Sequence, residues 1–241
     1  MLVHGWAVHS GIWRDFAQQL AQTYQVTCID LPGHGRSEKI DSFTLEQIGD
    51  ALVNAVPDES SCWLGWSLGA TVVLDIARRF PDRVNSLVLL AGNPAFTQTA
   101  QWPGMDVGLL DAFADKLNED CQATLLRFLS LQVNNLPDSK ILLRSLKSAV
   151  LECDAPDNDI LQGGLEILKN ADLRLVLSCI SVPVSVILGT RDTLVPVSAG
   201  QNMQELAPEI TLNIIDKAGH VPFLSHPQEV LAIISRFMDE Q

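Results

Sequence analysis

The sequence predicts an α/β fold in which a doubly wound, mostly parallel sheet carries a block of inserted helices. Three observations support this prediction. Short β-branched runs alternate with segments of helical period. Each run is apolar throughout, as strands buried on both faces are. The alternation stops between about residues 94 and 175, where helical patterns follow one another without a strand. We therefore expect a core of residues 1–93 and 176–241 and a helical cap of residues 94–175.

The elements follow in order from local composition. Apolar, β-branched runs predict strands at residues 26–30, 62–65, 87–91, 182–189 and 211–216. Helical period predicts core helices at residues 12–24, 68–80 and 227–238, and Pro227 suits a first helical turn. In the cap, the same period predicts helices at 109–117, 121–133, 139–151 and 160–168, separated by loops at 134–137 and 154–157.

Composition limits the classes of function. The chain has 241 residues, of which 47% are hydrophobic, so it can bury a sizeable core. Its net charge of −13 argues against a nucleic-acid partner, and no apolar run is long enough to span a membrane. The five cysteines form no C-x-x-C pair and the first residues resemble no secretory signal, so we expect a cytoplasmic protein with reduced thiols and no metal site.

A nucleophile is predicted at Ser67, in the sequence Gly65-Trp66-Ser67-Leu68-Gly69. The pattern G-x-S-x-G is short, but here a predicted strand ends at Gly65 and a predicted helix begins after Ser67. This is the strand-turn-helix context in which a serine is held at the carboxyl end of a sheet. The structural alternative is an ordinary strand-to-helix turn in which Ser67 only caps the helix.

A nucleophilic serine needs a base, and the base needs an orienting group. Asp192 directly follows the predicted strand 182–189, and His220 follows the next strand, so both belong at the same sheet edge as Ser67. Alternatively, Asp192 is a turn carboxylate and His220 a solvated loop imidazole. His226 is expected near a helix cap, His34 in a structural glycine-rich turn, and His9 in an early loop that could line a pocket.

Hydrolysis also requires hydrogen-bond donors for the oxyanion that forms during attack. One donor is expected to be the backbone N–H of Leu68, the residue after the nucleophile. The second should come from a loop after an early strand, and Leu2-Val3-His4-Gly5-Trp6 fits this description. We therefore expect the N–H of Trp6 to be the second donor, with a plain strand-to-loop turn as the alternative.

The motifs H-G-W, D-L-P-G-H-G-R-S, G-W-S-L-G, G-T-R-D-x-L-V-P and G-H-x-P-F-x-S-H-P resemble the α/β-hydrolase superfamily along nearly the whole chain. Within it, the sequence is most similar to the pimeloyl-acyl-carrier-protein methyl ester esterases of biotin synthesis. Trp66 is typical of that group. The cap segments 102–104, 127–132, 163–168 and 172–174 also match it more closely than they match generic hydrolase caps.

The resemblance implies a serine carboxylesterase that hydrolyses the methyl ester of a pimeloyl chain on acyl carrier protein, without metal or organic cofactor. It implies a catalytic triad of Ser67, Asp192 and His220. The residues implied to bind the oxyanion or the substrate are Trp6, Leu68, Trp66, Phe128, Leu129, Ser130, Leu131 and Gln132. Basic cap residues would contact the carrier, namely Arg127, Lys140, Arg144 and Lys147.

Charge is distributed as a carrier partner would require. Residues 121–150 have a net charge of +3, which leaves −16 for the rest of the chain. Lys140, Arg144 and Lys147 share one face of a predicted helix, where a basic island could steer an acidic protein. A solvated cap helix is the alternative. At Ala123 the sequence departs from the family, which tends to have another basic residue there. This difference weakens the prediction of a carrier partner more than the prediction of ester hydrolysis.

Two rival functions remain open at this stage. One is a carboxylesterase or C–C bond hydrolase acting on free small molecules, and the other is a non-catalytic ligand receptor on the same fold. The chain is expected to be a monomer. Only three residues precede the His-Gly motif, whereas relatives usually have a further hairpin there, so we expect the leading strands of the sheet to be missing.

Overall fold

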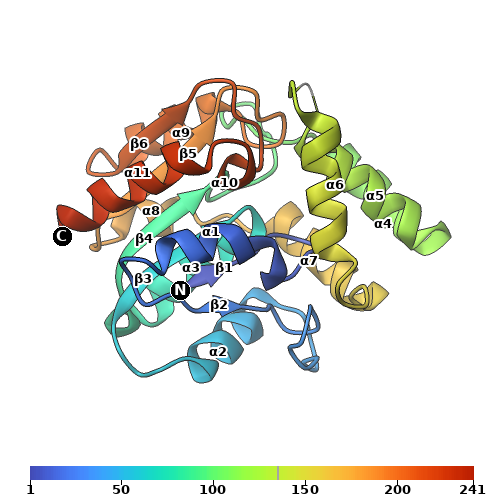
Figure 1. Cartoon of the computed structure of the whole chain (residues 1–241), viewed down its shortest axis with the longest axis horizontal. Coiled ribbons are helices and arrows are strands. Elements are labelled where there is room, and N and C mark those ends of the chain that lie inside the picture. The colour runs from blue at the N-terminus through green and yellow to red at the C-terminus, as the bar shows by residue number, and fades with distance from the viewer. Residues whose placement is uncertain (135) are drawn as a thin grey trace.

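A computed structural model describes residues 1–134 and 136–241 and shows a six-stranded sheet in the order β2-β1-β3-β4-β5-β6 (Figure 1). Every pair of neighbouring strands is parallel. All the carboxyl ends therefore meet at one edge of the sheet, where sites of doubly wound folds lie. The strands are β1 (Leu2–Val3), β2 (Cys28–Ile29), β3 (Ser61–Trp66), β4 (Val84–Leu90), β5 (Val184–Gly189) and β6 (Thr211–Ile215).

The two faces of the sheet are covered by separate hydrophobic clusters, because successive residues of a strand point to opposite sides. In β4, Leu87 and Leu89 belong to one cluster, and Val88 and Leu90 belong to the other. The first cluster includes side chains of α2 (Leu45–Ala55), α3 (Leu68–Arg79), α8 (Arg174–Cys179) and α9 (Val197–Leu206). The second includes side chains of η1 (Ser10–Trp13), α1 (Arg14–Leu20) and α11 (Pro227–Asp239). Two short elements complete the core, η2 (Pro81–Arg83) and α10 (Pro222–Ser225).

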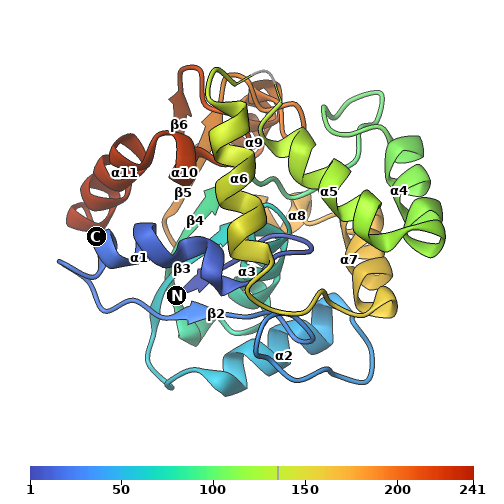
Figure 2. The same cartoon turned by 45° about the vertical axis from the view of Figure 1, so that its right-hand side comes forward.

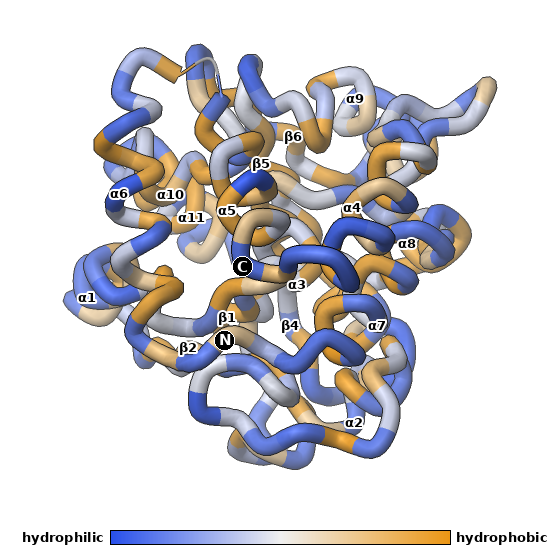
Figure 3. Tube along the Cα trace, turned by 90° about the vertical axis from the view of Figure 1, so that its right-hand side faces the viewer, coloured by the Kyte–Doolittle hydropathy of each residue, from blue (hydrophilic) through white to orange (hydrophobic). Residues whose placement is uncertain are grey.

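Four consecutive helices stand beside the sheet (Figure 2). They are α4 (Val107–Glu119), α5 (Cys121–Gln132), α6 (Ser139–Val150) and α7 (Asn158–Asn170). The segment that precedes them holds two isolated β-bridges, between Thr97 and Met105 and between Thr99 and Trp102. Hydrophobic and hydrophilic segments alternate along α6, which is an amphipathic helix with Leu142 and Leu146 buried (Figure 3).

The helical block is attached to the sheet-based part by polar contacts at one side. Lys39, in the loop before α2, pairs with Asp157 at 3.0 Å and with Asp159 at 2.7 Å, at the start of α7. Arg14 pairs with Glu152, which follows α6. These side chains are largely exposed to solvent, which screens their charges, so each pair contributes little stability by itself.

The helices and strands of the structure differ from the predicted ones mainly in the residues at which they begin and end. The helix expected over residues 12–24 is a 3₁₀ turn followed by α1, and it ends at Leu20. Helices α2 and α9 were not singled out in the sequence, although Thr44 caps α2 by accepting the N–H of Gln47. Within the described residues, none of the helices has both the length and the apolar character needed to cross a bilayer.

Candidate active site

Ser67 occupies a strained turn between β3 and α3. Its φ of 56° and ψ of −119° lie in a region that side-chain-bearing residues rarely adopt. The glycines on both sides permit the turn. A Cβ on Gly65 would lie 2.2 Å from the carbonyl oxygen of Gly69, and a Cβ on Gly69 would lie 2.4 Å from that of Val3. The close approach of helix and strands therefore explains both glycines of the motif.

The structure brings Ser67, His220 and Asp192 together in one hydrogen-bonded chain. Nε2 of His220 lies 2.9 Å from Oγ of Ser67, and Nδ1 of His220 lies 2.9 Å from Oδ2 of Asp192. The second carboxylate oxygen of Asp192 accepts the N–H groups of Leu194 and Val195 at 2.8 and 3.0 Å. Because Asp192 is thus fixed on both oxygens, it can hold the imidazole in the tautomer that leaves Nε2 free to accept a proton from Ser67.

Trp66 lies beneath this chain of residues. Its side chain is fully buried, and its indole N–H donates to the backbone carbonyl of His220 at 2.7 Å. The ring also packs edge-on against Phe223 with 5.1 Å between the ring centroids, and against Trp13 at 6.2 Å. The structure therefore places Trp66 where it supports the loop that carries His220.

Two backbone N–H groups flank the serine. Leu68 is the first residue of α3, so its N–H has no acceptor within the helix. The Gly5–Trp6 peptide follows β1, and a Cβ on Gly5 would lie 3.2 Å from Cβ of Ser67. Among the described residues, no backbone or side-chain acceptor takes the N–H of Trp6. Both groups are therefore available as donors beside Ser67.

The side chain of Trp6 connects the sheet edge to the helical block. Its indole N–H donates to the carbonyl of Leu161 in α7 at 2.9 Å, and its ring packs edge-on against Phe128 with the centroids 4.7 Å apart. Gly164 lies so close that a Cβ there would be 2.4 Å from Cδ1 of Trp6. Ser67 is only 4% exposed beside these contacts.

The segment from Phe128 to Gln132 is divided by the helical period of α5. Phe128, Leu129 and Gln132 are buried, and Leu131 is partly buried. The backbone carbonyl of Gln132 lies beside Gly219, the residue before His220. Ser130 is on the exposed face, where its hydroxyl donates to the carbonyl of Leu126 at 2.8 Å, so the structure does not bring it to Ser67.

Four basic residues of α5 and α6 face solvent without acidic partners among the described residues. Arg127, Lys140 and Arg144 are exposed and Lys147 is partly exposed. In the described part of the chain, none of the four forms an ion pair with a carboxylate. The guanidinium of Arg127 lies 5.9 Å from the ring centroid of Phe113. By contrast, Lys39, Arg78 and Arg174 are each paired with an aspartate.

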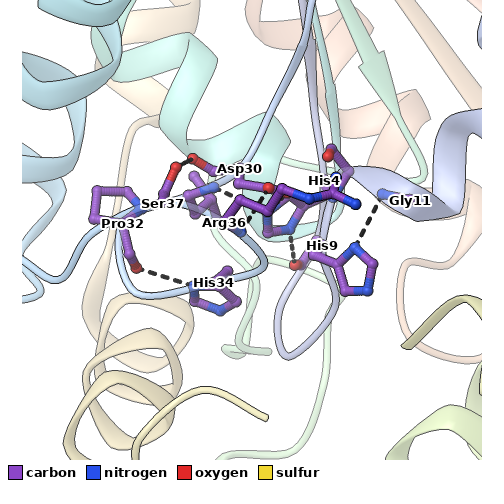
Figure 4. Close-up of polar contacts among 11 residues, drawn as sticks. His4, His9, Gly11, Asp30, Pro32, His34, Arg36 and Ser37 are labelled. Atoms are coloured by element: carbon purple, nitrogen blue, oxygen red, sulfur yellow. Dashed lines mark hydrogen bonds and ion pairs between the residues drawn. The ribbon is translucent and has the colours of Figure 1, made fainter. Parts of the chain in front are cut away.

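Three other histidines, His4, His9 and His34, form a buried group on two adjacent loops (Figure 4). The remaining one, His226, is partly buried at the N-cap position of α11, as expected. Burial lowers the pKa of His4 to about 3 and that of His34 to about 4, so both rings are neutral near pH 7. His34 bonds to the carbonyl of Pro32 through Nδ1 at 3.0 Å. His9 accepts the N–H of Gly11 at 3.1 Å and caps η1. Sequence reasoning placed His34 in a structural turn and gave His4 no role of its own.

Comparisons with known proteins agree with this geometry. Residues 1–227 match the family described as the alpha/beta hydrolase fold. The chain belongs to this α/β-hydrolase family. One curated relative is the pimeloyl-[acyl-carrier protein] methyl ester esterase of Methylococcus capsulatus, with 42% identity over 238 residues, which are 99% of this chain and 93% of the relative.

Solved structures show the same fold at low sequence identity. An esterase from Exiguobacterium antarcticum superimposes on this hydrolase with a TM-score of 0.87 and 21% identity, over 98% of this chain and 90% of that one. A hydrolase from Oleispira antarctica gives a TM-score of 0.88 with 18% identity, over 100% and 90% of the two chains. At these identities the likeness supports the fold alone.

Proposed function

We propose that this α/β hydrolase is a serine carboxylesterase that removes the methyl ester from a pimeloyl chain carried by acyl carrier protein. The observation that carries the ester chemistry is the chain of two 2.9 Å contacts from Ser67 through His220 to Asp192. The substrate is proposed from the 42% identical relative, whose name states that activity.

The reaction would proceed through an acyl-enzyme. His220 Nε2 takes the hydroxyl proton as Ser67 Oγ attacks the ester carbonyl, and the N–H groups of Trp6 and Leu68 bind the oxyanion. Asp192 stabilises the imidazolium. Collapse of the intermediate expels methoxide, which leaves as methanol with the proton from His220. A water molecule then gives a proton to His220 as its oxygen attacks the acyl-enzyme carbonyl. Collapse of this second intermediate breaks the bond to Ser67 Oγ, which takes the proton back from His220, and releases the pimeloyl chain with a free carboxyl group.

We propose that residues 94–175 act as a cap over this site. The hydrogen bond from the indole of Trp6 to Leu161 and the packing of Phe128 on the same ring support this division, because both join the sheet edge to the helical block. In this proposal, Phe128, Leu129, Leu131 and Gln132 line the path of the acyl chain.

We propose that the carrier docks on Arg127, Lys140, Arg144 and Lys147. Their lack of acidic partners within the described residues supports this assignment, since an unpaired basic patch on a chain of net charge −13 favours an acidic partner locally. The five cysteines are all free, which fits a reducing compartment, and we propose a cytoplasmic monomer.

Two assays test these parts separately. Ser67→Ala should retain less than about a hundredth of the wild-type turnover of a short p-nitrophenyl ester, because loss of a triad nucleophile costs far more than that. A higher turnover in this variant would contradict the assignment of Ser67 as the nucleophile.

Reversing charge at Arg127, Arg144 and Lys147 should lower kcat/KM for the carrier-bound ester by about tenfold or more while leaving kcat/KM for a free methyl ester unchanged. Equal effects on both esters would contradict the carrier proposal.

A further inference from the structure

His4 lies between β1 and the Gly5–Trp6 peptide, and both of its ring nitrogens have backbone partners. Nε2 lies 2.9 Å from the backbone nitrogen of Leu31, whose N–H donates to it. Nδ1 lies 2.8 Å from the carbonyl oxygen of Gly5. The ring has no exposed surface, so these two contacts are not shared with solvent.

The two partners fix the protonation state of His4. An N–H group can only donate, so Nε2 must carry a lone pair rather than a proton. A carbonyl oxygen can only accept, so Nδ1 must carry the proton. The neutral Nδ1–H tautomer is thus the form of the ring that satisfies both contacts, and the lowered pKa of His4, about 3, agrees with it.

The hydrogen bond to Gly5 also determines where the next N–H points. The carbonyl of Gly5 and the N–H of Trp6 belong to one planar trans peptide, in which they point in opposite directions. Holding the oxygen toward His4 therefore turns the N–H away from His4. Gly5 is packed against the nucleophile, since a Cβ at this position would lie 3.2 Å from Cβ of Ser67.

We propose that His4 is a positioning residue whose Nδ1–H holds the Gly5 carbonyl and so aims the Trp6 N–H at the oxyanion. This inference rests on the proposed function, in which that N–H is one of two oxyanion donors. A preoriented donor accelerates the reaction because it needs no rearrangement as negative charge develops.

The position of His4 in the core makes this bond independent of the cap. The indole of Trp6 is held by Leu161, which belongs to the proposed cap and would move with it. The Gly5–Trp6 peptide is held by His4, which is anchored to Leu31, two residues after the neighbouring strand β2. The donor would thus stay aimed while the cap opens for substrate.

A pair of isosteric substitutions separates the two bonds of His4. His4→Asn keeps an N–H donor near the Nδ1 position and loses the acceptor for Leu31. His4→Gln keeps an acceptor near the Nε2 position and loses the donor to Gly5. We expect kcat on a p-nitrophenyl ester to fall about 10- to 100-fold in His4→Gln, with KM changed less than about threefold, since the lost interaction acts in the transition state. His4→Asn should stay within about threefold of the control described next.

His34→Asn is the matched control, because it alters another buried histidine of the same group without touching the Gly5 carbonyl. Binding of a boronic acid that forms a tetrahedral adduct on Ser67 should weaken in His4→Gln by about the same factor as kcat/KM. Equal kcat values in His4→Gln and His34→Asn would overturn the inference. If His4→Gln does not fold, a tenfold or greater loss of kcat in His4→Asn relative to that control would overturn it. Activity surviving in Ser67→Ala would instead contradict the proposed function.

Discussion

Replacing Asp192 by asparagine should change the tautomer of His220 without changing the shape of the site. One carboxylate oxygen of Asp192 accepts two backbone N–H groups, from Leu194 and Val195, and the other faces Nδ1 of His220 at 2.9 Å. An asparagine will keep its oxygen on the two N–H groups, because turning its NH₂ toward them would leave both unsatisfied at about 1–3 kcal/mol each. Its NH₂ will then face Nδ1 of His220.

This orientation determines the size of the effect. Nδ1 of His220 must accept from the new NH₂, so the imidazole proton moves to Nε2, 2.9 Å from Oγ of Ser67. Nε2 can then no longer take the serine proton. Such a change of tautomer lowers kcat by about 10⁴, which corresponds to about 5.4 kcal/mol of transition-state stabilisation. KM should change little, because in the proposed mechanism Asp192 does not contact the substrate.

The assay is steady-state hydrolysis of a p-nitrophenyl ester at neutral pH, with the melting temperature measured in parallel. Asp216→Asn is the matched control, since Asp216 follows the neighbouring strand β6 and is exposed to solvent, where it accepts a hydrogen bond from Thr190. Its kcat should remain within about twofold of wild type. An Asp192→Asn variant that folds normally and keeps a tenth or more of the wild-type kcat would refute the reasoning.

Three further predictions follow from the buried contacts. Because burial lowers the pKa of His4 to about 3 and of His34 to about 4, from 6.5 in the unfolded chain, the unfolded state binds protons first as the pH falls. The free energy of unfolding should therefore fall between pH 6.5 and 4, by about 2 kcal/mol per histidine at pH 5. The fall should be smaller in His34→Asn, which has one buried histidine fewer. Equal urea midpoints of the wild type at pH 7 and pH 5 would contradict this prediction. Gly164→Ala should lower the melting temperature by several degrees, because its Cβ would lie 2.4 Å from Trp6, and an unchanged value in calorimetry would be the contrary result. Trp66→Phe removes the N–H that donates to the backbone carbonyl of the triad histidine at 2.7 Å, so kcat should fall about tenfold, and full activity would argue against a supporting role.

The sheet and the three residues of the proposed triad were predictable because each depends on local patterns that tertiary structure then preserves. Apolar runs gave the buried strands, and β3 to β6 lie within a few residues of the runs that predicted them. Parallel strands place their carboxyl ends at one edge, so the positions of Ser67, Asp192 and His220 after three strands were enough to predict that they meet.

Contacts between distant segments were not predictable in the same way. The hydrogen bond from Trp6 to Leu161 joins residues 155 positions apart, and it depends on how α7 docks. The bond between His4 and Leu31 likewise requires β1 and β2 to be neighbours, which no local pattern specifies. Ser130 was grouped with its neighbours by sequence similarity, although helical period alone would have placed it on the opposite face from Phe128.

The most direct test of the proposed function is the rate at which the purified protein releases methanol from the methyl ester of pimeloyl-acyl carrier protein. The expected result is multiple turnovers by the wild type, with kcat/KM above that for a free pimeloyl methyl ester, and no turnover by Ser67→Ala. Equal or lower kcat/KM for the carrier-bound ester would contradict the carrier as partner. Turnover that survives in Ser67→Ala would contradict the serine mechanism itself.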